Sequence, residues 1–222
     1  MAQLEIQKTL DGSATLYLPE MDEHYHSTYG ALTESQHIFI TMGIEKSASV
    51  APRVLEVGLG TGLNALLTAQ WARDRKIPVH YWGYELYPLP IETIRNLEYP
   101  AIVKDVDTSH YLDEIHDSVW GGQISVGTQM QLFKRHESIL DAQFETQFDV
   151  VYFDAFAPNK QEDIWVQDLF DRIAHNMASN AILTTYCCKG DVKRMLRAAG
   201  LEVKKVSGPP GGKREILNAF KR

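Results

Sequence analysis

The sequence has few cysteines, no long apolar run and no excess of positive charge. The only cysteines, Cys187 and Cys188, are adjacent, so they cannot form a disulfide framework, and a reducing cytoplasm is the expected setting. No stretch approaches the ~18 apolar residues of a membrane-spanning helix. Residues 1–10 also lack the basic and apolar parts of a signal peptide. We expect no metal site, because no carboxylates or cysteines accompany His24 and His26 at ligand spacing.

Acidic residues outnumber basic ones, and the net charge of -7 argues against a nucleic-acid partner. The distribution of charge argues the other way. Residues 188–222 contain ten Lys or Arg and three Asp or Glu, so this segment carries +7 and the rest of the chain -14. Such an asymmetry is typical either of a solvated surface or of a surface that contacts phosphates. Charge alone does not decide between them.

Apolar strands alternate with amphipathic helices over most of the chain. Residues 4–17 predict a hairpin around the turn Asp11-Gly12. Predicted strands cover residues 53–57, 79–84, 131–134, 149–153, 181–186, 201–206 and 215–220, and predicted helices cover residues 32–42, 64–75, 89–97, 163–177 and 192–199. The remainder of residues 105–135 shows no clear pattern. The alternation predicts an α/β fold with a mostly parallel sheet and an antiparallel last strand.

The length of 222 residues predicts one domain, 1–222. We expect residues 1–50 to form an N-terminal extension that contains the hairpin. Residues 51–222 would then form a Rossmann-like core.

Three alternating glycines, Gly58, Gly60 and Gly62, separate the first core strand from the helix that follows. Glycines allow a backbone to turn sharply and to approach a ligand where a Cβ atom would clash. Dinucleotide enzymes use the different spacing Gly-x-Gly-x-x-Gly to place a pyrophosphate at the helix. The shorter spacing favours S-adenosylmethionine, which has no phosphate. The alternative is a tight strand-to-helix turn without a ligand.

An acid, Glu85, ends the second core strand. An acid at this place can accept hydrogen bonds from both hydroxyls of an adenosine ribose. Nicotinamide enzymes and methyltransferases share this arrangement, and a solvated surface glutamate is the alternative. His136 and Glu137 follow the strand 131–134, where a contact with adenine is expected, although an ordinary surface pair explains them equally well.

Asp154 and Phe156 follow a very apolar strand. Open α/β sheets bind their ligands at the carboxyl ends of the strands. A carboxylate, an aromatic ring and a turn stiffened by Pro158 predict a site that positions an amine or a base. Asp154 could instead cap a helix, but Asp163 lies closer to the helix that follows.

These motifs resemble, in order along nearly the whole chain, a family of bacterial tRNA-modifying enzymes. The segments that carry the resemblance are Glu23–Ser27, Gly30–Ser35, Ile38–Ile40, Gly58–Asn64, Glu85–Leu89, Asp154–Pro158, Lys160–Trp165 and Gly211–Glu215. The family comprises the tRNA 5-methylaminomethyl-2-thiouridine methyltransferases of the MnmC or MnmD type. Two-domain members carry an additional flavin-dependent domain, for which 222 residues leave no room, so we expect the stand-alone form. Many members have glycine where this chain has Ala155.

The resemblance implies a cytoplasmic Rossmann-like methyltransferase that uses S-adenosyl-L-methionine. Its reaction would convert 5-aminomethyl-(2-thio)uridine at the wobble position of tRNA into the 5-methylaminomethyl base. Asp154 would be the catalytic residue, and the substrate would be the anticodon arm. The expected substrate-binding residues are Tyr25, Phe156, Lys160, Lys213 and Arg214. The expected cofactor-binding residues are Glu56, Gly58, Leu59, Gly60, Thr61, Gly62, Asn64, Glu85, Leu86, His136, Glu137 and Asp154.

Other functions are compatible with the same fold. A small-molecule amine methyltransferase or a polyamine aminopropyltransferase would also place an aspartate beside an amine, and an acidic protein suits a cationic polyamine. A non-catalytic tRNA-binding or scaffold protein is a further alternative, but such a protein would be expected to lose the glycine loop or Asp154. The glycine spacing makes a nicotinamide dehydrogenase the weakest candidate.

Overall fold

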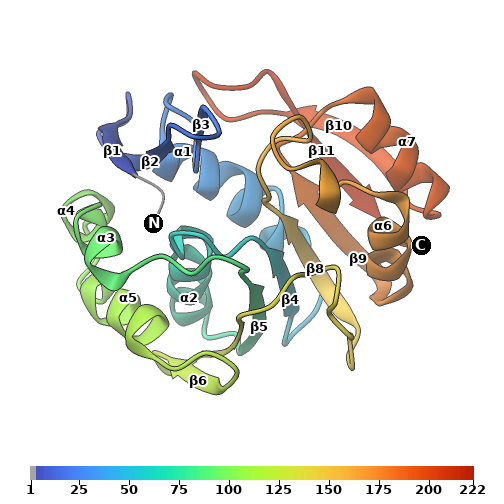
Figure 1. Ribbon diagram of the computed structural model, residues 1–222. Coiled ribbons are helices and arrows are strands. Elements are labelled where there is room, and N and C mark those ends of the chain that lie inside the picture. Colours follow the sequence, from blue (N-terminus) through green and yellow to red (C-terminus); the bar gives the residue numbers. More distant parts are fainter. Residues whose placement is uncertain (1–3) are drawn as a thin grey trace.

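The computed structural model describes residues 4–222, so residues 1–3 of the expected domain lie outside the described part (Figure 1). Its centre is an eight-stranded sheet in the order β10-β11-β9-β8-β4-β5-β7-β6. The strands are β4 (Arg53–Val57), β5 (Val79–Tyr84), β6 (Gln123–Val126), β7 (Met130–Arg135), β8 (Phe148–Phe153), β9 (Met177–Thr185), β10 (Glu202–Ser207) and β11 (Glu215–Phe220). Strands β7, β5, β4, β8 and β9 pair in parallel, whereas β11 is antiparallel to both of its neighbours. The predicted mostly parallel sheet with an antiparallel last strand is confirmed.

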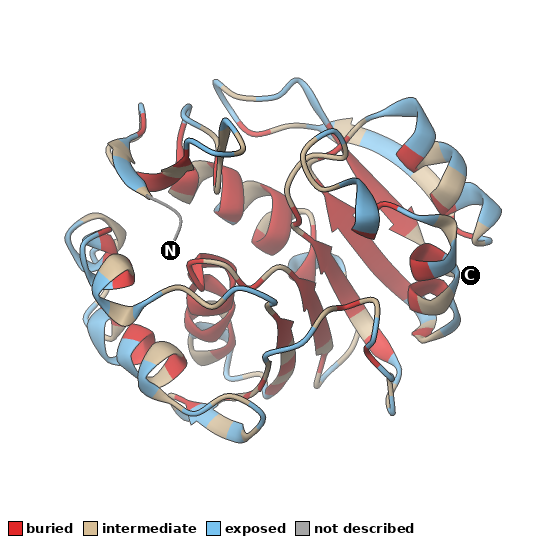
Figure 2. Ribbon diagram, in the orientation of Figure 1, coloured by how far each residue is buried: buried red, intermediate tan, exposed pale blue. Residues whose placement is uncertain are grey.

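Alternating side chains of the central strands separate two apolar cores. In β8, Val150 and Tyr152 face one core, while Val151 and Phe153 face the other. The first core packs against α2 (Leu63–Arg75) and α5 (Thr108–Asp117), and the second against α6 (Gln167–His175) and α7 (Gly190–Ala198). Because both faces are covered, the central strands β4 and β8 are almost wholly buried (Figure 2).

The N-terminal residues form a separate three-stranded sheet and a helical segment. The strands are β1 (Glu5–Lys8), β2 (Ala14–Leu18) and β3 (Glu23–His24), and the helical elements are α1 (Ala31–Ser35), the π-helix η1 (Gln36–Thr41) and the 3-10 helix η2 (Ile44–Lys46). The predicted hairpin is therefore present, and the predicted helix 32–42 corresponds to α1 together with η1. Figure 1 shows this extension beside the β10–β11 end of the chain.

The structure departs from the predicted elements in three places. Residues 99–126 contain α4 (Tyr99–Val103), α5 and β6, and α3 (Ile91–Arg95) is shorter than the predicted helix 89–97. The apolar spacing of Tyr111, Leu112 and Ile115 in α5 was masked by the polar residues around them. The predicted helix 163–177 is divided into the 3-10 helix η3 (Glu162–Ile164) and α6, and Met177 begins β9 because it pairs with Phe148.

Asp11 joins the first hairpin to helix α1. Its Oδ1 accepts hydrogen bonds from Thr9 and from the backbone and side chain of Ser13. Its Oδ2 accepts bonds from the backbone nitrogen of Thr33 at 2.9 Å and from the Thr33 hydroxyl at 2.8 Å. Burial alone would raise the pKa of this carboxyl, but the hydrogen bonds from Ser13 and Thr33 outweigh it and lower the pKa to about 2. Asp11 therefore fixes the position of α1, which includes Glu34.

We expect Asp11→Ala to lower the free energy of unfolding at pH 7 by about 2 kcal/mol, since hydrogen bonds to a charged group are worth about 1.5–3 kcal/mol. The pKa of Asp11 is lower in the folded protein than in the unfolded chain, so this stabilisation is present above about pH 4 and is lost as the pH falls towards 2. Urea unfolding at several pH values measures it, with the exposed Glu5→Ala as the control. A constant difference between Asp11→Ala and the wild type from pH 7 to pH 2 would contradict this role.

Candidate functional site

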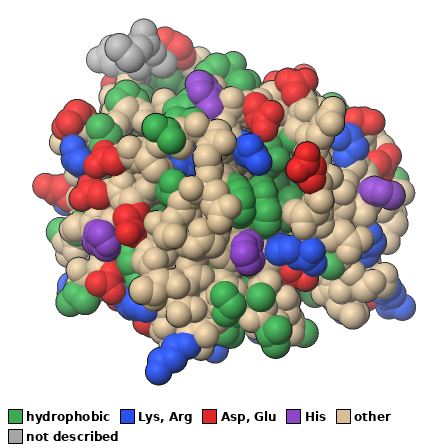
Figure 3. Space-filling view, turned by 90° about the horizontal axis from the view of Figure 1, so that it is seen from below, with side chains coloured by type: hydrophobic (Ala, Val, Ile, Leu, Met, Phe, Trp, Pro, Cys, Tyr) green, Lys and Arg blue, Asp and Glu red, His purple; other side chains and the backbone are tan. Residues whose placement is uncertain are grey.

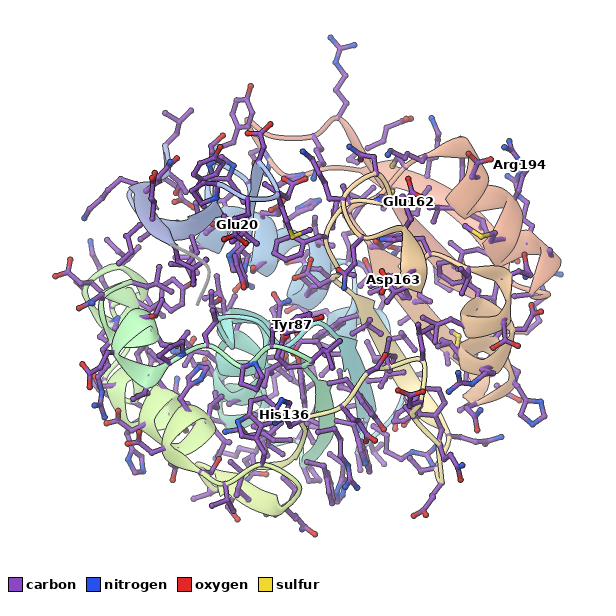
Figure 4. All side chains as sticks on the ribbon, in the orientation of Figure 1. Glu20, Tyr87, His136, Glu162, Asp163 and Arg194 are labelled. Carbon is purple, nitrogen blue, oxygen red and sulfur yellow. The ribbon has the colours of Figure 1, made fainter. Side chains whose placement is uncertain are left out.

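A cleft of about 1830 Å³ lies at the carboxyl ends of β4, β5 and β8. Strands β4 and β8 are neighbours in the sheet, although they lie far apart in the sequence. Open α/β sheets bind their ligands at the carboxyl ends of two such strands. Segments 57–64, 84–90 and 154–164 form its floor and sides, and the N-terminal residues 18–29 close over it. Figure 4 labels Tyr87, His136 and Asp163 around this region. The volume exceeds the ~300–1,000 Å³ of a typical small-molecule site, which leaves space for two ligands.

The glycine loop is shaped by close backbone contacts. Gly58, Gly60 and Gly62 all have positive φ angles, of 88°, 51° and 73°. A Cβ atom at Gly58 would lie 2.9 Å from the backbone oxygen of Asp154, and one at Gly62 would lie 2.6 Å from Nε2 of His116. Gly58 is therefore required for β4 and β8 to pack together. Gly62 is required for α2 to begin in contact with α5.

Glu85 closes the glycine loop from the neighbouring strand. Its Oε2 accepts a hydrogen bond from the backbone nitrogen of Gly60 at 2.9 Å, and its Oε1 accepts one from the backbone nitrogen of Tyr87 at 2.8 Å. The carboxylate is thus held in one orientation at the wall of the cleft. Each carboxylate oxygen has a second lone pair, so a vicinal diol in the cleft can donate to it.

Asp154 lies at the cleft end of β8 and is held by one amide. The Nδ2 atom of Asn64 donates to Oδ2 of Asp154 at 2.8 Å and to Oε1 of Glu56 at 2.9 Å. Asn64 is buried in the first turn of α2, and Glu56 is fully buried in β4. Among residues 4–222, no donor reaches the other oxygen of Asp154, and Asp154 lines the cleft. One carboxylate oxygen is therefore anchored while the other is available to a ligand.

The environment of Asp154 favours a neutral carboxyl group. Burial raises its pKa, the negative charge of Glu34 raises it further, and the bond from Asn64 and the positive charge of Lys213 lower it, to give about 7. Burial also raises the pKa of Glu56 well above its usual value. A carboxyl group with a pKa near 7 exchanges a proton readily at neutral pH, as a general base must.

Aromatic side chains form one wall of the cleft. Tyr25 meets Phe156 edge to face, with ring centroids 5.0 Å apart, and a Cβ atom at Gly60 would lie 3.4 Å from the Tyr25 ring. The motif after β8 is fixed from behind, because Trp165 donates to the backbone oxygen of Phe156 at 2.8 Å and Tyr186 donates to that of Ala155 at 2.8 Å. Phe156 is therefore presented by a fixed backbone, with Tyr25 between it and the glycine loop.

The cleft contains most of the residues predicted from the sequence. Those that line it are Tyr25, Gly58, Leu59, Gly60, Thr61, Asn64, Glu85, Leu86, His136, Glu137, Asp154, Phe156, Lys160 and Lys213. Glu56, Gly62 and Arg214 do not line it. The side chain of Glu56 points into the core to meet Asn64, and Gly62 packs under His116. Arg214 is exposed.

The cleft also contains residues that the sequence does not predict as ligand-binding, and Glu34 and Tyr186 are the two that bear on its chemistry. Glu34 on α1 and Tyr186 after β9 both line it. Burial raises the pKa of Tyr186, and the charges of Asp154 and Glu34 raise it further. Glu34 is part of a segment that carries the family resemblance, yet no spacing connects it to Asp154, which lies 120 residues away. Tyr186 is a second aromatic residue near a strand end, and such a pattern is only weak evidence for a binding site.

Half of the basic side chains of the C-terminal segment form ion pairs within the fold. Five of its ten basic side chains lie within 4.0 Å of a carboxylate: Arg194, Lys204, Lys205, Lys213 and Arg222. Lys221 donates to three backbone oxygens, including that of Met177 at 2.7 Å. Acidic and basic side chains are also interspersed on the face in Figure 3. Four of these five ion pairs use Asp191, Glu202 and Glu215, which the net charge of +7 already includes, so the segment keeps an excess of positive charge.

The described residues also bear on two other kinds of site. Within residues 4–222, no group of three His, Cys, Asp or Glu side chains is arranged to hold a metal ion. No helix in that range combines the length and apolar character that crossing a membrane requires.

Known proteins resemble this chain over most of its length. Residues 128–222 match the family described as S-adenosyl-L-methionine-dependent methyltransferase. The chain is 31% identical over 222 residues to the "tRNA 5-methylaminomethyl-2-thiouridine biosynthesis bifunctional protein MnmC" of Burkholderia multivorans, and 29% identical over 221 residues to that of Paraburkholderia xenovorans. These matches cover 91% and 92% of this chain and 33% of each relative. The chain thus spans one third of the length of these relatives.

Solved structures share the fold. MnmC2 from Aquifex aeolicus superposes with a TM-score of 0.79 at 22% identity, which covers 99% of this chain and 70% of that one. Spermidine synthase from Thermotoga maritima superposes with a TM-score of 0.62 at 14% identity, over 100% of this chain and 69% of that one. The predicted Rossmann-like fold and the resemblance to the MnmC proteins are confirmed. From the family match, these relatives and the glycine loop, we conclude that the chain belongs to the S-adenosyl-L-methionine-dependent methyltransferases.

Proposed function

We propose that this protein methylates the primary amine of 5-aminomethyl-(2-thio)uridine at the wobble position of tRNA and forms the 5-methylaminomethyl base. The observation that carries the proposal is Asp154, a carboxylate anchored by one oxygen and open to the cleft by the other, beside the Phe156 ring. The name of the MnmC relatives supports the choice of substrate. We further propose that residues 1–222 act as one domain. Because the proposed substrate is a tRNA, we also propose that the reaction takes place in the cytoplasm.

The cleft fits S-adenosyl-L-methionine in its chemistry. Glu85 offers two fixed oxygens for the ribose hydroxyls, and the glycine loop allows close approach of the ligand to the backbone. The Oδ1 atom of Asn64 is buried without a partner among the described residues, so it can accept from an ammonium group such as that of the methionyl part. His136, Glu137 and Leu86 surround the place expected for adenine. When bound, the cofactor supplies an activated methyl group on its sulfonium.

Asp154 would prepare the amine. An alkyl amine with a pKa of about 10 is mostly protonated at pH 7 and has no free lone pair. Asp154 can accept its proton, because the environment holds the pKa of this carboxyl near 7. The bond from Asn64 fixes the carboxylate, so the amine nitrogen that it holds is directed to one place. Glu56 would act indirectly, by fixing Asn64.

Aromatic residues would hold the base. The wobble nucleotide must leave its stack to reach Asp154, and a flipped base is commonly received by aromatic rings. Phe156 and Tyr25 provide such a surface beside Asp154. Lys160 and Lys213 at the cleft, and Arg214 outside it, would contact phosphates of the anticodon arm.

A small amine substrate is the second candidate function. The pair of acids Asp154 and Glu34 and the net charge of -7 favour a cationic molecule such as a polyamine. The structural likeness to spermidine synthase shows only the shared fold. The two candidates are separated by the methyl acceptor.

The test is incubation of the purified protein with radiolabelled S-adenosyl-L-methionine and tRNA from cells that lack the activity, followed by chromatography of the nucleosides. We expect label in 5-methylaminomethyl-2-thiouridine. tRNA that already carries the methylated base is the control and should stay unlabelled. Absence of label in tRNA, with label entering small amines, would replace the proposal by the second candidate.

The pH dependence of kcat/KM tests the role of Asp154. Because an ionised Asp154 takes the proton from the ammonium form of the amine, log kcat/KM should rise with a slope of about 1 below pH 7 and become level above it, where the amine still carries its proton up to about pH 10. Asp154→Asn should lower kcat by about 10²–10⁴ and abolish the change of slope. The exposed Asp168→Asn on α6 is the control. An unchanged profile in Asp154→Asn would rule out the proposed role.

Glu85→Ala should weaken cofactor binding. Loss of hydrogen bonds to a charged group costs about 1.5–3 kcal/mol, so we expect the Kd for S-adenosyl-L-methionine to rise about 10- to 100-fold. Calorimetric titration measures this, and the exposed Glu92→Ala on α3 is the control. Equal Kd values for Glu85→Ala and the wild type would show that Glu85 does not bind the ribose.

A further inference from the structure

The ammonium group of Lys213 occupies an aromatic and acidic corner of the cleft. Its Nζ atom lies 3.9 Å from the ring centroid of Tyr186 and 3.4 Å from Oε1 of Glu34. A cation over an aromatic face and beside a carboxylate is the arrangement that proteins use to bind alkylammonium ligands. All three residues line the cleft.

The two partners of Lys213 are fixed by the fold. The side chain of Glu34 is only 10% exposed, and its Oε2 accepts a hydrogen bond from the backbone nitrogen of Ser27 at 2.8 Å. Asp11 positions the turn of α1 that carries Glu34, through the backbone nitrogen of Thr33. The hydroxyl of Tyr186 donates to the backbone oxygen of Ala155. The Glu34 carboxylate and the Tyr186 ring therefore keep their positions when another cation replaces the Lys213 ammonium group.

Lys213 itself is weakly held. Its side chain is 44% exposed, and it follows the turn Pro209–Gly212 between β10 and β11. Its contact with Glu34, at 3.4 Å, is longer than the usual 2.7–2.9 Å of a charge-assisted hydrogen bond. Removal of Lys213 would leave Glu34 buried in the cleft without a counter-ion among the described residues. This acidic position requires a cation, and Lys213 is the member of the group that can move away.

The corner adjoins Asp154. The charges of Glu34 and Lys213 both affect the pKa of Asp154, and Tyr186 contacts the residue that follows Asp154. A ligand ammonium at this corner is therefore near the carboxylate that would take its proton.

We propose that Tyr186 and Glu34 form a subsite for the ammonium group of the substrate, and that Lys213 occupies this subsite until the substrate displaces it. The inference rests on the proposed function for the identity of the amine. The substrate then enters as a cation, and one proton passes from its ammonium nitrogen to Asp154, which leaves the neutral amine and the protonated carboxyl. The displaced Lys213 is released towards the RNA backbone, so phosphate contact and amine entry occur together.

Binding of n-butylammonium chloride tests the subsite without tRNA. In calorimetric titrations, we expect Lys213→Met to bind this amine at least 10-fold more tightly than the wild type, because the competing cation is gone. The double variant Lys213→Met, Glu34→Gln should lose this gain. Lys204→Met is the matched control, since Lys204 also lies near a carboxylate (Glu202, 3.2 Å) and a ring (Phe220, 5.1 Å) but on an exposed strand. It should bind as the wild type does.

Equal affinity of the wild type and Lys213→Met for the amine would overturn the subsite, and so would an equal gain in Lys204→Met. Lys213→Gln repeats the test if the methionine variant is unstable in thermal unfolding. The tRNA assay separates this inference from the proposed function. Methylation of tRNA by the wild type without the gain in Lys213→Met removes only the subsite, whereas the gain without methylation of tRNA retains the ammonium site and removes tRNA as the substrate.

Discussion

The side-chain amide of Asn64 connects the three elements on which the site depends. Asn64 lies in the first turn of helix α2. Its amide donates one proton to Glu56 of β4 and the other to Asp154 at the end of β8. An amide nitrogen has two donors, and both are used here. The two bonds therefore fix the sheet, the helix α2 and the reactive carboxylate relative to one another. This arrangement depends on Gly58, because any larger residue would push β4 away from the backbone of Asp154.

The N-terminal extension completes a site that the core alone would leave open. Its loop places Tyr25 against Phe156, and its helix α1 carries Glu34 to the cleft. The hydrogen bonds of Asp11 join α1 to the hairpin, and the backbone nitrogen of Tyr25 donates to the backbone oxygen of Leu16 in the same hairpin. The core thus supplies features that suit a cofactor, and the extension supplies much of the surface that would distinguish the acceptor.

The parts of the fold and site that the sequence predicts are those encoded locally. The glycine loop, Glu85 and Asp154 each follow an apolar strand directly, so their place at the strand ends can be read without the tertiary structure. Glu34 and Tyr186 cannot be found in this way, because α1 and the turn after β9 come to the same cleft only in the folded chain. The polar setting of Tyr111 likewise hid α5.

The wall formed by Tyr25 has a consequence for the strength of ligand binding. One side of its ring faces the glycine loop, and the ring also packs against Phe156 at a steep angle. A ligand on either side fixes the same ring, and the entropy of ordering it is lost only once. Each ligand should therefore increase the affinity for the other by the same factor, as thermodynamic reciprocity demands. A single tyrosine would in this way make the cleft cooperative without any movement of the sheet.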